Sequence, residues 1–266
     1  MTARIWVMQF LERPSARVGF EVRGDGLPVL FTHGFGDMSA TFARTAGVLA
    51  VDHQVVTWDL PGHGLGEHPQ DAHHYAIETV TDHMRALLDH LAVARAVVVG
   101  YSVGGYLSLE FALAYPGRVR ALIMIDTGPG TRSEQARAAW NDFADRCAGG
   151  LQAGGAVVMP TSLAHIDVRH RDTRGLALAA RGFLRQQDSR VIDGLYTLTM
   201  PTLVIVGAED STFLRSAHYL ARWLPDASLV IIPGAGHMPH LSQPERFDAA
   251  VRRFLDELAV EPKEQS

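Results

Sequence analysis

The sequence GYSVG at residues 100–104 places Ser102 between two glycines, after three valines and before a long apolar run. A serine hydroxyl attacks a carbonyl only when a neighbouring base takes its proton and hydrogen-bond donors receive the charge on the carbonyl oxygen. A sharp turn from a strand into a helix would lift the hydroxyl above a sheet, and the glycines would let the turn approach its neighbours. The stretch therefore predicts a nucleophile, with a helix-capping serine as the alternative.

Five short stretches carry a resemblance to the α/β-hydrolase family. They are THGFGD (32–37), DLPGHG (59–64), GYSVGG (100–105), GAED (207–210) and GAGHMPH (234–240). The resemblance implies a nucleophile, an acid and a histidine in that order along the chain, each following a strand. It therefore implies a triad of Ser102, Asp210 and His237, in which His237 takes the proton from Ser102 and Asp210 orients His237.

Two of these assignments have competitors nearby in the sequence. His240 follows His237 by three residues and could instead be a loop histidine bonded to the backbone. Asp126 also ends a predicted strand and also falls between serine and histidine, so chain order leaves it open as the acid; otherwise it is a cap or ion-pair partner. Glu209, beside Asp210, is the third candidate.

The negative charge that develops on an attacked carbonyl needs backbone donors. Val103 follows the nucleophile at the expected start of a helix, where N–H groups are free. By resemblance, the second donor is the N–H of Phe35, whose side chain would then form a wall of the acyl pocket. His33 is expected to brace that loop through hydrogen bonds rather than to catalyse.

Strand and helix patterns alternate along most of the chain, which predicts an α/β fold with a mostly parallel sheet of about eight strands. The alternation lapses after the sixth main strand, where alanine- and arginine-rich helical segments follow. We therefore expect a core of residues 1–128 and 199–266 and a helical cap, or lid, of residues 129–198. In the closing helix, Ser242 and Glu245 are spaced as a capping box.

Composition limits the partners of this 266-residue chain. Its net charge is −5 and it has no basic block, which argues against nucleic acid and anionic membranes. No apolar run approaches the ~18 residues that span a bilayer, and the start lacks the pattern of a signal peptide. The single cysteine, Cys147, fits a cytoplasmic location.

Other classes of protein fit the sequence less well. The stretch Gly34-Phe35-Gly36 followed by Asp59 resembles an altered dinucleotide fingerprint, as in an NAD-dependent oxidoreductase. That interpretation leaves the Ser102 turn unexplained. The histidine spacings lack a metal-ligand context, so we expect no metal and no cofactor. A non-catalytic small-molecule receptor on the same fold is the third alternative.

The sequence therefore predicts a serine hydrolase that cleaves a small to medium carboxylic ester through an acyl-enzyme. Lactones, thioesters and C–C bonds next to carbonyls are alternative substrates for the same triad. Cofactor-free haloperoxidase or dioxygenase activity is an alternative reaction for it. The expected partner is a small acyl substrate. The sequence leaves the oligomeric state open.

Overall fold

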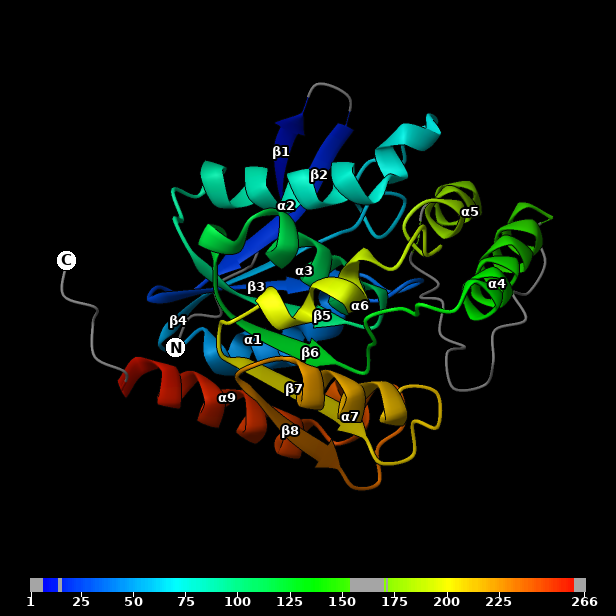
Figure 1. The fold of residues 1–266 in the computed structure, drawn as a ribbon. Helices are drawn as coiled ribbons and strands as arrows, with labels where there is room; N and C mark the ends of the chain where they lie inside the picture. The colour runs from blue at the N-terminus through cyan, green and yellow to red at the C-terminus, as the bar shows by residue number, and fades with distance from the viewer. Residues whose placement is uncertain (1–6, 14–15, 154–169, 171, 261–266) are drawn as a thin grey trace.

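A single eight-stranded sheet runs through the computed structural model, which describes residues 7–13, 16–153, 170 and 172–260 (Figure 1). Its strands are β1 (Gln9–Arg13), β2 (Ala16–Arg23), β3 (Leu27–Thr32), β4 (His53–Trp58), β5 (Ala96–Tyr101), β6 (Val119–Ile125), β7 (Thr202–Gly207) and β8 (Ala227–Ile232). The helices are α1 (Ala43–Leu49), α2 (Ile77–His90), α3 (Val103–Ala114), α4 (Glu134–Gln152), α5 (Thr173–Arg181), α6 (Arg190–Gly194), α7 (Leu214–Trp223), α8 (Pro239–Ser242) and α9 (Pro244–Val260).

The order of the strands in space is β1-β2-β4-β3-β5-β6-β7-β8. The pairs β1–β2 and β2–β4 are antiparallel, and every later pair from β4 to β8 is parallel. The expected mostly parallel sheet of about eight strands is therefore confirmed, and its first two strands form an antiparallel pair. Because β3 and β5 to β7 run in parallel, the loops that follow them lie at one edge of the sheet.

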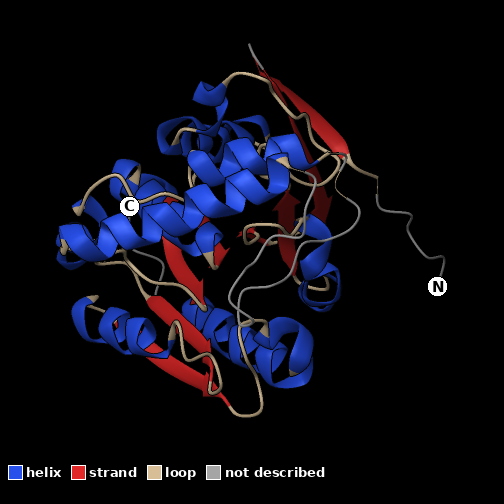
Figure 2. Ribbon diagram, turned by 90° about the vertical axis from the view of Figure 1, so that its right-hand side faces the viewer, coloured by secondary structure: helices blue, strands red, loops and turns tan. Residues whose placement is uncertain are grey.

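Helices cover both faces of this sheet, as the turned view makes plain (Figure 2). One buried apolar cluster joins β strands to α2, α3 and α7, and a second joins the opposite face to α1 and α9. Strand β5 shows why its sequence is almost purely valine: Val98 belongs to the first cluster, whereas Val97 and Val99 belong to the second. A strand buried on both faces needs apolar residues at every position.

Helices α4, α5 and α6 fall between β6 and β7, where the sequence predicts a helical insert. Residues 154–169 and 171 of that predicted insert lie outside the described residues. The apolar face of the described part continues the core, because Cys147, Leu176 and Phe183 are buried in the same cluster as α2 and α3. Among the described residues, no helix has both the length and the apolar character required to cross a membrane.

The predicted capping box at the closing helix is wrong. Ser242 is the last residue of α8, and its hydroxyl donates to the carbonyl of Met238 at 3.0 Å. Pro244 then opens α9 directly. The sequence pattern fails here because a serine at the end of one helix and the start of the next can serve only one of them.

Candidate active site

Ser102 lies in a strained turn between β5 and α3. Its φ of 53° and ψ of −121° are unusual for a residue with a side chain. Two hydrogen bonds hold the turn: the Ser102 N–H donates to the carbonyl of Ile125 at 2.9 Å, and the Thr127 hydroxyl donates to the carbonyl of Ser102 at 2.7 Å. Such strain persists only where the surroundings impose it, and it occurs mainly at functional sites.

The glycines on either side of Ser102 are required by close contacts. A Cβ on Gly100 would collide with the backbone of Gly104 and Gly105 on α3. A Cβ on Gly104 would collide with the carbonyl oxygens of Thr32 and His33, at the end of β3. The spacing of glycines in the sequence therefore reflects the tight packing of α3 against two strands.

The three residues of the expected triad lie in one hydrogen-bonded chain. The Nε2 atom of His237 is 3.1 Å from the hydroxyl of Ser102, and its Nδ1 atom is 2.7 Å from a carboxylate oxygen of Asp210. These residues follow β5, β7 and β8, so the parallel sheet brings together positions as far apart as 135 residues in the sequence. The ring of Phe213 stacks on His237 at 5.1 Å and limits how the imidazole can turn.

Asp210 is fully buried and held from its own loop. Its Oδ1 atom accepts from the N–H groups of Thr212, at 3.0 Å, and Phe213, at 3.1 Å. Burial alone would raise the pKa of the Asp210 carboxyl, but the hydrogen bond and charge of His237 outweigh it, and the pKa is lowered. Asp210 therefore stays ionised, as an acid that stabilises an imidazolium must.

Asp126 lies beside this chain as a second buried carboxyl group. Its Oδ1 atom accepts from the Gly207 N–H at 3.0 Å, and it interacts with Asp210. Burial, together with the neighbouring Asp210, raises the pKa of Asp126 to about 9, although the hydrogen bond from the Gly207 N–H opposes this rise. Asp126 is therefore neutral at pH 7 and can donate its proton to Asp210, whereas its carboxyl group forms no hydrogen bond with the imidazole of His237 within the described part of the chain.

Asp126, Asp210 and His237 also form the one group of potential metal-binding side chains found within the described ranges, with ligand atoms within 4.8 Å of one another. Two of those atoms are already joined by the 2.7 Å contact between Asp210 and His237. We therefore interpret the group as a hydrogen-bonded chain that leads to Ser102.

Two competing residues, His240 and Glu209, lie outside this hydrogen-bonded chain. His240 is buried, and its Nε2 atom contacts the Thr41 hydroxyl at 2.9 Å. Glu209 is exposed. The ring nitrogens of His33 bond to backbone atoms of Gly34 and Leu60, as expected of a residue that braces its loop.

The loop after β3 lies directly against the nucleophile. A Cβ on Gly34 would come within 3.2 Å of the Ser102 Cβ. In the part of the chain that the structure describes, the N–H groups of Phe35 and Val103 donate to no other group. Two histidines fix the loop, because His63 accepts from the Gly36 N–H at 3.0 Å and His170 contacts the Gly36 carbonyl at 2.8 Å. This loop and the start of α3 thus each leave one free N–H donor beside Ser102.

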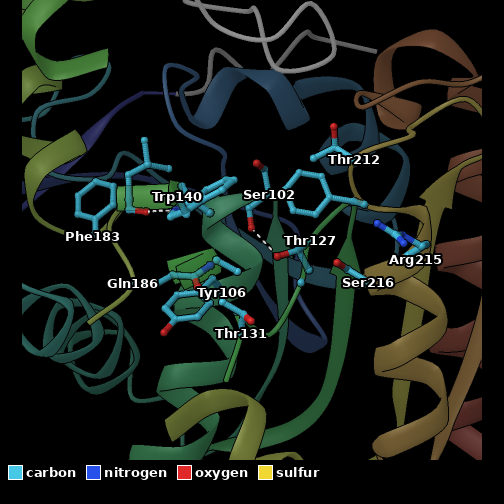
Figure 3. Close-up of a pocket in the computed structure, with 16 residues that line it drawn as sticks. Ser102, Tyr106, Thr127, Thr131, Trp140, Phe183, Gln186, Thr212, Arg215 and Ser216 are labelled. Atoms are coloured by element: carbon cyan, nitrogen blue, oxygen red, sulfur yellow. Dashed lines mark hydrogen bonds between the residues drawn. The ribbon is translucent and has the colours of Figure 1, made fainter. Parts of the chain in front are cut away.

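A cavity of about 490 Å³ opens at Ser102 (Figure 3). Its lining comes from the core and from the segment between β6 and β7, with Trp140 on α4 and with Phe183 and Leu184 just after α5. Phe183 and Leu184 therefore contribute both to the buried apolar cluster and to the pocket. Sequence patterns give no hint of Trp140, because nothing local distinguishes it from a core residue.

The alternative interpretation as a dinucleotide-binding protein requires an acidic side chain that is free to bind a ribose, and Asp59 is not free. Both oxygens of Asp59 are engaged: Oδ1 accepts from the Ser39 N–H at 2.8 Å and Oδ2 from the Leu65 N–H at 2.9 Å. The side chain ties two loops together and is not available for a ribose. The motif at 34–36 is instead part of the loop beside Ser102.

Comparisons with known proteins agree with this architecture. The model of the alpha/beta hydrolase family matches residues 29–250. A pimeloyl-(acyl-carrier protein) methyl ester esterase of Chromobacterium violaceum is 32% identical, over 89% of this chain and 97% of its own. A thermophilic esterase from Thermogutta terrifontis superposes with a TM-score of 0.78 at 29% identity, over 96% of this chain and 99% of its own. MenH from S. aureus shares the fold, with a TM-score of 0.82 at 24% identity over 90% and 98% of the two chains.

The family model spans most of the sheet and every strand end that carries a residue of the hydrogen-bonded chain. This chain belongs to the alpha/beta hydrolase family.

Proposed function

We propose that this protein is a serine hydrolase that cleaves a small to medium carboxylic ester. The observation that carries the proposal is the chain from Ser102 through His237 to Asp210, with contacts of 3.1 Å and 2.7 Å. Similarity to the Chromobacterium and Thermogutta esterases supports ester cleavage.

The proposed mechanism follows from which atom holds each proton. Ionised Asp210 can only accept, so Nδ1 of His237 carries the hydrogen and Nε2 is free to take the proton of Ser102. The alkoxide attacks the ester carbonyl, and the N–H groups of Phe35 and Val103 receive the oxyanion. His237 then protonates the departing alcohol, and water hydrolyses the acyl-enzyme by the reverse sequence. Each oxyanion donor is worth about 2.7–4 kcal/mol in comparable enzymes.

In this proposal, residues 129–198 form a cap that covers the cavity and sets specificity, on a core of residues 1–128 and 199–266. Trp140, Phe183 and Leu184 supply one apolar wall of the cavity. An apolar wall and a volume of about 490 Å³ suit an acyl group of small to medium size. Lactones, thioesters and C–C bonds next to carbonyls would present the same electrophilic carbon to Ser102.

A panel of p-nitrophenyl esters and lactones of graded acyl length, beside a fluorophosphonate probe, tests the proposal. We expect turnover of the shorter and medium esters and stoichiometric labelling of the Ser102-containing peptide, found by mass spectrometry. Labelling without turnover would indicate a receptor with a reactive serine. Labelling at another residue, or none, would contradict the proposed nucleophile.

A further inference from the structure

The cavity at Ser102 has two ends of different chemistry (Figure 3). Tyr106, Trp140 and Phe183 lie on one side of Ser102, and Arg215 and Ser216 lie on the other, at the start of α7. Arg215 is the sole charged side chain among the described residues that line the cavity. One end is therefore aromatic and the other is positively charged.

Arg215 is an exposed residue, and no carboxylate of the described residues lies within ion-pair distance of its guanidinium. By contrast, Arg132, Arg185 and Arg190 each pair with an aspartate. An arginine with free donors beside a cavity is suited to bind a carboxylate in two-pronged fashion.

Arg215 places its positive charge in the first turn of α7. It is the second residue of α7, and that first turn holds no acidic residue. The N-terminus of a helix carries partial positive charge, so a cation there is unfavourable while an anion is stabilised. The ionised Asp210 already accepts from the N–H groups of Thr212 and Phe213, directly before α7. An anion bound at this end of the cavity would pair with the guanidinium of Arg215.

We propose that the substrate is an ester that carries a carboxylate, bound by Arg215, with its apolar part against Tyr106, Trp140 and Phe183. This inference rests on the proposed serine hydrolase function and names its substrate class. Since Ser102 lies between the two ends, the carboxylate and the apolar part would extend in opposite directions from the reacting carbonyl.

Two pairs of esters test the inference and locate the carboxylate. The acyl-side pair is p-nitrophenyl hydrogen adipate and p-nitrophenyl hexanoate. The alcohol-side pair is 4-(hexanoyloxy)benzoate and phenyl hexanoate. In Arg215→Ala, we expect the ratio of kcat/KM for the charged ester to that for its neutral partner to fall about tenfold to a hundredfold in one pair. Arg215→Glu should lower that ratio further, and Arg215→Lys should restore part of it.

Arg222→Ala is the matched control, because Arg222 is an exposed arginine in the last turn of the same helix, outside the cavity lining. It should leave both ratios unchanged. Unchanged ratios in Arg215→Ala, or an equal fall in Arg222→Ala, would overturn the inference but leave the hydrolase intact. If the wild type hydrolyses no ester and takes up no fluorophosphonate, the proposed function fails and this inference fails with it.

Discussion

Ser102→Ala is expected to lower kcat for any ester substrate by about 10⁴- to 10⁶-fold, because the attacking oxygen is lost and the rest of the triad has nothing to activate. Within the described ranges, the Ser102 hydroxyl has its hydrogen-bond contact with His237, at 3.1 Å. The bonds that hold the turn use backbone atoms of Ser102, and alanine keeps them. The variant should therefore fold normally, with an unfolding temperature close to that of the wild type.

The measurement is ester turnover together with thermal unfolding followed by circular dichroism. Ser228→Ala is the control, since Ser228 is an exposed serine on β8, the strand at the far edge of the sheet. That variant should retain full activity. Turnover by Ser102→Ala within tenfold of the wild type would remove Ser102 as the nucleophile, and loss of the folded state would show that the hydroxyl has a structural role instead.

Much of the fold could be predicted from the sequence because its determinants are local. Alternating apolar patterns predicted the strands and helices, and the glycines around Ser102 predicted a turn that the structure explains by contacts with Thr32, His33 and Gly105. The resemblance to the α/β-hydrolase family nominated Asp210 and His237, whereas chain order alone left Asp126 open as the acid. A short motif could point to these positions because each follows a strand of the parallel sheet.

The lining of the cavity could not be predicted in the same way. Trp140 and Arg215 line the same cavity only because α4, which follows β6, and α7, which follows β7, reach the same edge of the sheet. Nothing near Trp140 in the sequence marks it as different from an apolar core residue. The protonation of Asp126 could not be predicted from the sequence either. Its carboxyl group is neutral because it is buried beside Asp210, and the sequence does not show this burial.

Replacement of each buried aspartate by asparagine should affect activity to very different extents, with a large loss at Asp210 and a small one at Asp126. In Asp210, the Oδ1 atom accepts from the N–H groups of Thr212 and Phe213, so asparagine must keep its oxygen there. Its NH₂ group would then face Nδ1 of His237. Nδ1 would become an acceptor, Nε2 would carry the hydrogen, and the imidazole could no longer take the proton of Ser102.

We therefore expect Asp210→Asn to lower kcat by about 10³- to 10⁴-fold, as the loss of the correct tautomer does in serine proteases. The loss should persist across the pH range in which the wild type is active, because an amide does not titrate. A pH–rate profile of kcat for both proteins checks this. An Asp210→Asn variant within tenfold of the wild type would move the role of acid elsewhere, with Asp126 as the first candidate.

For Asp126→Asn, the same reasoning predicts that most of the activity is kept. The Gly207 N–H fixes the amide oxygen at Oδ1, so the NH₂ group faces Asp210 and donates as the protonated acid does. Activity at pH 7 should therefore fall by less than about tenfold. A greater loss than in Asp210→Asn would reverse the assignment of the two acids.

The stability of Asp126→Asn provides an independent check on its protonation. The ordinary pKa of an aspartate is 3.8 and that of buried Asp126 is about 9, so between these values the folded protein binds a proton that the unfolded chain releases. The free energy of unfolding of the wild type therefore falls through this group as the pH rises from about 4 to about 9. Asparagine lacks this dependence. The difference in unfolding free energy, Asp126→Asn minus wild type, should grow with pH over that range and level off above it, and urea titrations at several pH values would measure it. A difference that is constant with pH would mean that Asp126 is ionised in the folded protein, and would contradict its role as a donor to Asp210.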